Sequence, residues 1–357
     1  MTAPSSRAWR ARRRLVGRWR RCTHWEFWPM WAFYPPVVAW ILWLGVKHRG
    51  FTVFTAANPG IPDGGFIGES KHAILSGLAA AGDAVAPHRL IAPDADPAAR
   101  LAALDAFVRH VGTTYPIVLK PDIGQRGAGV RIVRSCEAAA DYLARVSGPV
   151  IAQAFAPGHE FGVFYVRHPG ETRGRIFSIT EKVLPTLVGD GVRTLETLIL
   201  ADARAVCMAR AYQAANAERL HDVPAAGEAV LLVEVGTHAR GAIFRDGNWA
   251  RTPALEAAMD RVSQAFEGFH IGRYDLRTPS IEDFMAGDNF RIVELNGVTA
   301  EATDIYDARN SVWTAWRTLC RQWSLAFEIG AAHRARGVPV TPLSRLWRSV
   351  RAYEAVD

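Results

Sequence analysis

Short blocks of apolar residues alternate with polar blocks along the chain, and their periods predict a mixture of helices and strands. A period of two residues is typical of strands, and a helical period is typical of amphipathic helices. Strands are predicted at 51–56, 115–119, 130–133, 230–235, 242–245, 272–277 and 290–296, with short strands and loops alternating up to residue 156 and again over 160–188. Helices are predicted at 68–78, 97–111, 194–217, 253–267 and 311–329. This mixed order favours α+β lobes over one doubly wound sheet.

One uncharged segment, residues 27–46, has the length and apolarity of a membrane-spanning helix. Three features argue against a simple span: Pro35 and Pro36 lie in its middle, its aromatic residues are spread throughout, and both of its flanks are basic. We therefore expect attachment to one face of a membrane, through a Pro-broken hairpin or an interfacial segment whose arginines bind anionic headgroups. A full span, and packing of the segment against the body of the protein, are the alternatives.

The net charge of +7 comes from the N-terminal segment 1–49, which alone carries +9 and leaves −2 for the rest of the chain. A nearly neutral body argues against a nucleic-acid groove, so no nucleic-acid partner is expected. The four cysteines lie far apart, which excludes a disulfide scaffold and a zinc ribbon and is typical of a reducing compartment. They are Cys22, Cys136, Cys207 and Cys320.

Lysine is scarce, with four residues against 38 arginines, and one of the four begins a glycine-rich run. Lys120 precedes Gly124, Gly127 and Gly129, and a predicted strand lies on each side of the run. Glycines at such a turn let backbone N–H groups converge on an anion such as a phosphate. In a Walker A loop the lysine follows the glycines, so this is a different arrangement. A purely structural turn is the alternative.

A second motif joins two of the predicted strands. Alternation along a strand places Arg273 and Asp275 on one face, and likewise Glu294 and Asn296 on the next strand. If the two strands pair, Asp275, Glu294 and Asn296 converge as hard oxygen ligands of the kind that Mg²⁺ prefers. The alternative is a solvated polar face of an antiparallel pair.

Taken in order, these motifs resemble the ATP-grasp superfamily, and most of all its D-alanine–D-alanine ligase-like carboxylate–amine ligases. The resemblance covers about residues 116–303 and also includes Lys182 and the run from Gln153 to Gly162. The run 188–195 is similar to the cyanophycin synthetase and glutamate-ligase branches. The resemblance implies an α+β fold in which two lobes hold ATP between them.

The resemblance also implies roles for individual residues. Lys120 and Lys182 would meet the phosphates of ATP beneath the glycine loop of Gly124, Gly127 and Gly129. The backbone from Gln153 to Phe155 would contact adenine, and Glu160 would bind the ribose hydroxyls. Mg²⁺, with Mn²⁺ as a substitute, would be held by Asp275, Glu294 and Asn296. Arg273 and Lys182 are the implied catalytic residues, with Arg273 stabilising the oxyanion of the reaction.

The chain departs from the family pattern in two places. The region 50–115 is short for the N-terminal α/β domain of the family, and Arg89 is the candidate for its early phosphate-binding residue. The run 297–301 replaces the Pro-Gly of the peptide ligases. The expected domains are a basic, Trp-rich membrane segment (1–49), an abbreviated region before the grasp (50–115), lobe 1 (116–157), lobe 2 with the metal site (158–307) and C-terminal helices (308–357).

Two further groups are candidates for substrate binding. Glu69, Ser70 and Lys71 follow a glycine cluster at a predicted helix start, where donors can bind a substrate carboxylate or another anion. A helix cap with a solvated lysine is the alternative. His238 lies in a glycine-bounded run and is a candidate for the acceptor end of the cleft, with a structural histidine as the alternative.

The predicted function is an ADP-forming carboxylate–amine ligase that uses Mg-ATP, forms an acyl phosphate and works at the cytoplasmic face of the inner membrane. Its partners would be a small carboxylate, an amine, the membrane surface bound by residues 1–49, and, as one expected assembly, a second copy of the chain. The alternatives are an ATP-grasp phosphotransferase acting on a small or lipid-linked substrate, and a nucleotide-binding module without chemistry.

Overall fold

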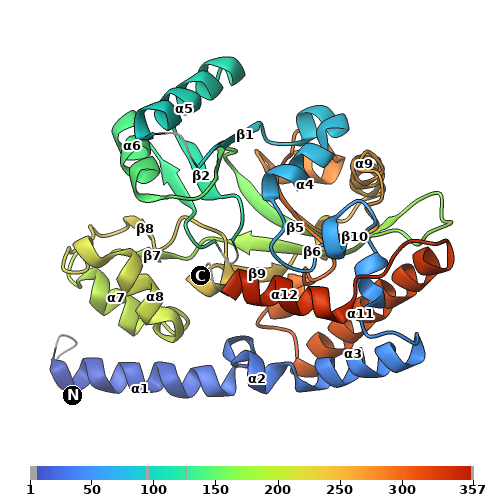
Figure 1. Cartoon of the computed structure of the whole chain (residues 1–357). Helices are drawn as coiled ribbons and strands as arrows, with labels where there is room; N and C mark the ends of the chain where they lie inside the picture. Colours follow the sequence, from blue (N-terminus) through green and yellow to red (C-terminus); the bar gives the residue numbers. More distant parts are fainter. Residues whose placement is uncertain (1–5, 94–95, 125–126, 355–357) are drawn as a thin grey trace.

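The computed structural model describes residues 6–93, 96–124 and 127–354, and two antiparallel sheets form its frame (Figure 1). The first sheet has the order β1-β4-β2-β3. Its strands are β1 (His88–Ile91), β2 (Ile117–Pro121), β3 (Arg131–Val133) and β4 (Val150–Ala154). Helices α5 (Pro97–Val111) and α6 (Cys136–Arg145) share one apolar core with this sheet. We call this unit lobe 1.

The second sheet has the order β11-β10-β5-β6-β9 and is apolar on both faces. Its strands are β5 (His159–Val166), β6 (Arg175–Val183), β9 (Ile243–Asp246), β10 (Ile271–Thr278) and β11 (Arg291–Asn296). One face packs on α4 (Lys71–Gly77), α9 (Pro253–Gln264) and α10 (Ile281–Ala286). The other face packs on α3 (Pro35–Lys47) and α11 (Val312–Ala335). We call this unit lobe 2.

A smaller unit completes the body. It consists of the hairpin β7 (Thr186–Val188) and β8 (Ala229–Leu231) with helices α7 (Leu195–Ala201) and α8 (Ala209–Ala215). The remaining α-helices are α1 (Arg7–Thr23), α2 (Met30–Phe33) and α12 (Leu343–Glu354). Short 3₁₀ helices are η1 (Trp25–Phe27), η2 (Val53–Ala56), η3 (Pro62–Gly64), η4 (Ala79–Ala84), η5 (Ala205–Met208), η6 (Ala217–Arg219), η7 (His238–Arg240), η8 (Asn248–Ala250) and η9 (Thr303–Tyr306).

The predicted α+β class is confirmed, and so are most of the predicted elements. The helix predicted at 97–111 is α5, and the strands predicted at 272–277 and 290–296 are β10 and β11. The helical pattern over 68–78 is α4, which begins three residues later than the pattern because Ser70 caps it.

Three predicted elements are wrong. The strand expected at 51–56 is the 3₁₀ helix η2, whose four side chains are all buried, so its apolar run shows no helical or strand period. The single helix expected at 194–217 breaks at Asp202, whose carboxylate accepts hydrogen bonds from the next backbone N–H groups. Residues 136–145, expected as part of a strand-and-loop region, form helix α6 behind its N-cap Ser135.

The N-terminal segment lies along one edge of the molecule and packs on the body over much of its length. Helices α1, α2 and α3 follow one another along this edge, so the expected hairpin does not form (Figure 1). Pro35 and Pro36 occupy the first turn of α3, where proline starts a helix without losing a hydrogen bond. Val37 and Leu44 of α3 are buried. Among the described residues, no helix is long and apolar enough to cross a membrane.

Several of the N-terminal arginines bind the body of the protein. Arg13 donates to the carbonyls of Leu200 and Ala201 at the end of α7, where a cation also favours the helix dipole. Glu26 is buried and accepts two hydrogen bonds from Arg204, at 2.8 and 3.1 Å. These contacts fix residues 7–26 to the smaller unit.

A single buried amide joins the glycine-rich turn after η2 to the start of β10. Asn58 is fully buried, and its Oδ1 accepts hydrogen bonds from the backbone N–H groups of His270 and Ile271, both at 2.9 Å. Its Nδ2 donates to the carbonyls of Gly64 and Ile271. The side chain therefore satisfies four backbone groups that no water can reach.

We expect the substitution Asn58→Ala to lower the free energy of unfolding by about 3 kcal/mol or more, because it leaves several buried backbone groups without partners. Gln264 on α9 is an exposed residue whose amide donates to Asp260 Oδ2 at 2.8 Å, and as a control Gln264→Ala is expected to cost only about 1 kcal/mol, since water can replace the lost amide. Urea denaturation of both variants measures the difference. Equal small losses would show that Asn58 does not hold the turn.

Candidate functional site

A cavity of about 740 Å³ is lined by residues from both lobes and from the two ends of the chain. We call it the cleft. It brings together most of the site residues predicted from the sequence. These are Lys120, Gly124, Gly127, Gln153, Phe155, Glu160, Lys182, Arg273, Asp275, Glu294 and Asn296, together with the substrate candidates Glu69, Lys71 and His238. The lining does not include Gly129, Ser70 or Arg89.

Strand pairing places the charged residues of lobe 2 side by side. The predicted pairing of β10 with β11 is present, and it sets Asp275 opposite Glu294 and Arg273 opposite Asn296. The pairing of β5 with β6 sets Glu160 opposite Lys182. Since β10 also pairs with β5, all four strands contribute to one face of the cleft.

The side chains on this face form a buried network of alternating charge. The Nζ atom of Lys182 lies 3.1 Å from Glu160 Oε1 and 3.0 Å from Asp275 Oδ2. On its other side, Asp275 accepts a hydrogen bond from Arg273 Nε at 3.0 Å. Burial alone would raise the pKa of Asp275, but Arg273 and Lys182 outweigh it and hold that pKa well below its usual range.

Lys120 links lobe 1 to lobe 2. Its side chain is almost fully buried, and its Nζ donates to Gln153 Oε1 at 3.0 Å and to the Val293 carbonyl of β11 at 2.9 Å. The Nε2 atom of Gln153 donates to the same carbonyl at 3.2 Å. Burial lowers the pKa of Lys120 to about 8, against the attraction of Glu294. A bound anion at this position would favour the charged form of the lysine.

The glycine hairpin follows Lys120 directly. Gly127 and Gly129 have φ values of +74° and +69°, which side chains rarely adopt, so this turn requires glycine. Residues 125 and 126 of the predicted phosphate loop lie outside the described residues. Lys71 does not point to a separate anion site, because its Nζ donates to the carbonyls of Asp122 and Gly124 at the base of the hairpin.

The neighbours of Lys71 have different surroundings. The Ser70 hydroxyl accepts a hydrogen bond from Ala73 N at 3.0 Å and caps α4, which matches the structural alternative for this residue. Glu69 lines the cleft, and burial raises the pKa of its carboxyl group. Its Oε1 atom is buried without a hydrogen-bond partner among the described residues.

The oxygen atoms of Asp275, Glu294 and Asn296 suit a hard divalent cation. Two carboxylates and one amide match the donors that Mg²⁺ takes in proteins. The Asn296 Nδ2 atom is buried without a hydrogen-bond partner in the described structure. Within the described ranges, no three His, Cys, Asp or Glu side chains form a group that could hold a metal, so the predicted set relies on the asparagine for its third donor.

Sequence reasoning missed the residues at the far end of the cleft. Glu301, Tyr306 and Tyr34 line it, as do Met30 of α2 and Tyr353 of α12. The ring of His238 stacks on Tyr306 with centroids 4.8 Å apart, so the histidine does reach this end. No spacing signal relates these positions, because they come from segments far apart in the chain.

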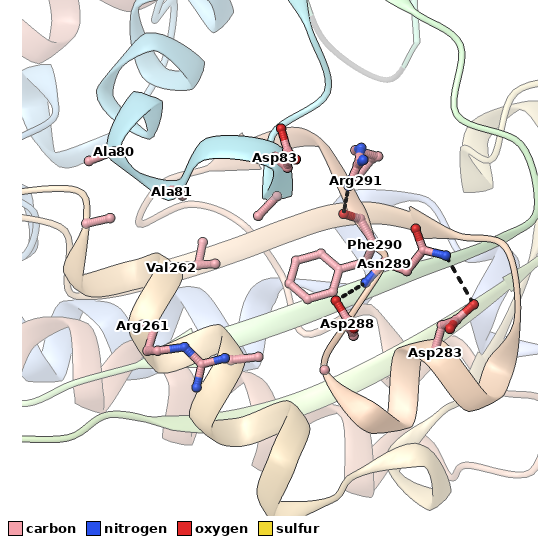
Figure 2. Close-up of a pocket in the computed structure, with 14 residues that line it drawn as sticks. Ala80, Ala81, Asp83, Arg261, Val262, Asp283, Asp288, Asn289, Phe290 and Arg291 are labelled. Atoms are coloured by element: carbon pink, nitrogen blue, oxygen red, sulfur yellow. Dashed lines mark hydrogen bonds between the residues drawn. The ribbon is translucent and has the colours of Figure 1, made fainter.

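Figure 2 shows a second cavity, of about 640 Å³, between η4, α9 and the turn before β11. Its charged lining residues are Asp83, Arg261, Asp283, Asp288 and Arg291. Asp283 is already engaged by the hydroxyl of Ser280, at 2.7 Å, and by Asn289. None of the predicted site residues lies here, so the cleft is the better candidate for a functional site.

Comparisons with known proteins identify similar ligases. No family model matches the chain. Over 135 residues it is 31% identical to cyanophycin synthetase of Trichormus variabilis, which covers 35% of this chain and 14% of that protein. The chain thus spans only a small part of this curated relative.

Among solved structures, the chain is similar to a bifunctional glutathione synthetase from Pasteurella multocida (15% identity, TM-score 0.39, 71% of this chain and 35% of that one). It is also similar to the ATP-grasp ligase PsnB (16%, 0.38, 71% and 60%) and to the D-alanine–D-alanine ligase from Coxiella burnetii (11%, 0.41, 80% and 61%). The match to cyanophycin synthetase agrees with one of the branches named from the motifs.

The charge network generates a stability prediction. We expect Lys182→Met to lower the free energy of unfolding by about 3 kcal/mol or more, because Glu160 then loses its nearest cation and Asp275 keeps only Arg273 in a buried site. Lys47→Met removes an exposed lysine of α3 and serves as the control, with a change below about 0.5 kcal/mol. Thermal or urea unfolding in the absence of nucleotide measures both.

The pH dependence of stability, compared between the unaltered protein and Lys182→Met, provides a second measurement. The pKa of Asp275 is depressed in the folded state, so its contribution to stability is complete above the unfolded pKa of about 3.9 and is lost as the pH falls further. The unaltered protein should therefore lose stability below about pH 4 more steeply than Lys182→Met. Parallel curves would show that Lys182 does not depress the pKa of Asp275.

Proposed function

We propose that the chain is an ATP-dependent, ADP-forming carboxylate–amine ligase of the ATP-grasp type. The observation that carries this proposal is the cleft itself, in which three cations, two of them buried, face three oxygen ligands between two α+β lobes. The cations are Lys120, Lys182 and Arg273, and the ligands are Asp275, Glu294 and Asn296. A site of this kind suits a reaction that gathers negative charge on phosphate and carboxylate oxygens.

ATP would bind with its phosphates between the lobes. Lys120 and Lys182 would contact the phosphates, and the hairpin that contains Gly124, Gly127 and Gly129 would cover them. ATP would then replace Glu160 as a partner of Lys182 and release that carboxylate for the ribose hydroxyls. The backbone of Gln153–Phe155 would contact adenine, beside the ring of Phe155, which already lies 5.3 Å from the Arg277 guanidinium.

Mg²⁺, or Mn²⁺ in its place, would be held by Asp275, Glu294 and Asn296. When bound, the ion would neutralise charge that develops on the transferred phosphoryl group. The residues of the cleft would hold the attacking carboxylate oxygen in line with the bond between the γ-phosphorus and ADP. A carboxylate oxygen attacks the γ-phosphorus, the bond to ADP breaks, and an acyl phosphate forms. An amine then attacks the acyl carbon, and phosphate leaves. Arg273 lies in the cleft next to Asp275, where it would stabilise the oxyanion of both steps.

The N-terminal helices offer a surface for a membrane. The outward face of α3 is apolar over its whole length and includes Val38, Leu42, Trp43 and Val46. Trp31 of α2, on the same edge of the molecule, is 81% exposed (Figure 1). On α1, the exposed Leu15 and Trp19 alternate with exposed arginines. An apolar face flanked by cations fits an anionic membrane surface, here the cytoplasmic face where ATP is available.

The proposed ligase activity is tested by the release of ADP and phosphate from Mg-ATP, in pools of amino acids, hydroxy acids and amines. We expect release that depends on both an acid and an amine, and its abolition by Glu294→Gln. Arg273→Lys is expected to lower kcat by about 100-fold, because a single ammonium cannot replace the forked guanidinium. Arg251→Lys, at an exposed arginine between η8 and α9 that pairs with Glu256, is the matched control and should leave kcat unchanged.

The products decide between the proposed and alternative functions. A condensed product with free phosphate supports the ligase. A phosphorylated substrate that persists in the presence of amines would instead identify a phosphotransferase. ATP binding without turnover in every pool would identify a nucleotide-binding module and contradict the proposal.

The membrane contact has its own test. We expect the full-length protein to float with mixed phosphatidylcholine–phosphatidylglycerol vesicles. The double substitution Leu42→Asp and Trp43→Asp should lower the bound fraction by about tenfold or more, because two apolar side chains would no longer be buried in lipid. Val192→Asp, at a side chain that is 80% exposed on the smaller unit, is the control. Deleting residues 1–46 is a poor test, since it would remove Glu26 and Leu44 from the core.

Two results would contradict membrane binding. Equal flotation of all three proteins would mean that this face does not contact lipid. In the second, the protein does not bind the vesicles but forms dimers, and the double substitution separates them. That result would identify the face of α3 as a homodimer interface.

A further inference from the structure

The cleft continues beyond the proposed metal ligands to a carboxylate that the reaction described above does not use. Arg273 lies between the two regions. Its Nε and Nη2 donate to Asp275, and its Nη1 donates to the backbone carbonyl of Glu301 at 3.0 Å. Glu301 therefore lies directly on the other side of the residue that would stabilise the oxyanion.

The segment around Glu301 is held rigidly on both sides. The Gln322 side chain of α11 accepts a hydrogen bond from Ala302 N at 3.0 Å and donates to the Ala300 carbonyl. The Thr303 and Thr180 hydroxyls lie 2.9 Å apart. The carboxylate itself accepts a hydrogen bond from the Tyr306 hydroxyl at 3.1 Å. Such a fixed position is what a group that acts on a substrate requires.

The surroundings of Glu301 suit a ligand that brings a positive charge and a proton. Burial raises the pKa of Glu301 to about 7, against the hydrogen bond from Tyr306, so the group can exchange a proton near neutral pH. Arg273, the cation that reaches the backbone carbonyl of Glu301, is paired with Asp275. An ammonium group would give the Glu301 carboxylate a charged partner of its own.

Apolar and aromatic side chains line much of the cleft that contains Glu301. Met30 and Tyr34 come from the N-terminal segment, Trp323 from α11 and Tyr353 from α12, and all four line the cleft together with Phe66. Met30 belongs to α2, and Tyr34 is the N-cap of α3. Both helices lie on the edge that carries the exposed apolar face (Figure 1). A ligand in this space would bury an apolar body next to its polar group.

We propose that Glu301 and Tyr306 form the subsite of the amine acceptor, a primary amine on an apolar body, and that Glu301 takes the proton that the amine loses. This inference rests on the proposed ligase function. The amine enters as an ammonium ion beside the Glu301 carboxylate and transfers one proton to it. The nitrogen lone pair then forms the C–N bond to the acyl carbon, and the C–O bond to phosphate breaks with its electron pair. The second proton leaves the nitrogen with the departing phosphate.

The test separates the two half-reactions, using the acid pool that supports phosphate release. Hydroxylamine traps an acyl phosphate as a hydroxamate, and it is largely unprotonated at neutral pH, so it needs no base. Hexylamine is an ammonium ion at this pH and does need one. We expect Glu301→Gln to form hydroxamate like the unaltered protein, and to lower condensation with hexylamine by about 100-fold or more. Glu301→Asp should restore part of the lost condensation rate.

The controls address folding and the apolar wall. Glu256→Gln, at an exposed ion pair on α9, should change neither half-reaction. Melting temperatures of all variants check that the fold is intact. The unaltered protein should condense hexylamine faster than ethanolamine, which has a similar ammonium group but no apolar body.

Three other outcomes would contradict the proposal, and each concerns a different part of it: the base, the class of amine or the ligase function. If Glu301→Gln condenses hexylamine at the unaltered rate, or loses hydroxamate formation to the same extent, Glu301 is not the acceptor base. Faster reaction with ethanolamine would overturn the apolar amine as the acceptor class. If the unaltered protein forms no hydroxamate in any pool, the ligase function itself fails, and the subsite fails with it.

Discussion

The contact of Lys182 with Glu160 and Asp275 is the interaction on which the cleft depends. The lysine offsets the cost of burying charge beside it, since an unpaired buried charge costs several kcal/mol. The lysine reaches both only because β5, β6 and β10 are neighbours in one sheet. The charge pairing of the site therefore depends on the register of the sheet. A slip of one strand by one residue would turn its charged side chains to the opposite face.

The two ends of the chain take part in the same arrangement. Glu26, near the N-terminus, is buried against Arg204 of the smaller unit, and Tyr353 of α12 lines the cleft. Gln322 of α11 holds the backbone on both sides of Glu301. Met30 of α2, on the same edge as the exposed apolar face, also lines the cleft. If that face rests on a membrane, an amine with an apolar body could reach the cleft without crossing water.

Sequence reasoning succeeded where the chemistry lies on a regular strand. Arg273 and Asp275 share a face by alternation alone, and Glu294 follows the same rule on the next strand. It failed where local pattern and tertiary contact disagree. The run at 51–56 is buried on all sides and so shows no period, and Asp202 ends a helix that composition alone would continue. Burial against distant segments decides the first conformation, and a side-chain cap on the N–H groups of Arg204 and Ala205 decides the second.

The sequence by itself determined the α+β class, the strands that carry the charged residues and the glycine hairpin after Lys120, because these follow from periods of two to four residues. The tertiary structure alone decided which charges neutralise one another, since the partners of Lys182 are 22 and 93 positions away along the chain. It also decided that residues 7–26 pack on the body and that Glu301 lies beside Arg273. Burial and pairing depend on which distant segments become neighbours, and no short-range pattern records that.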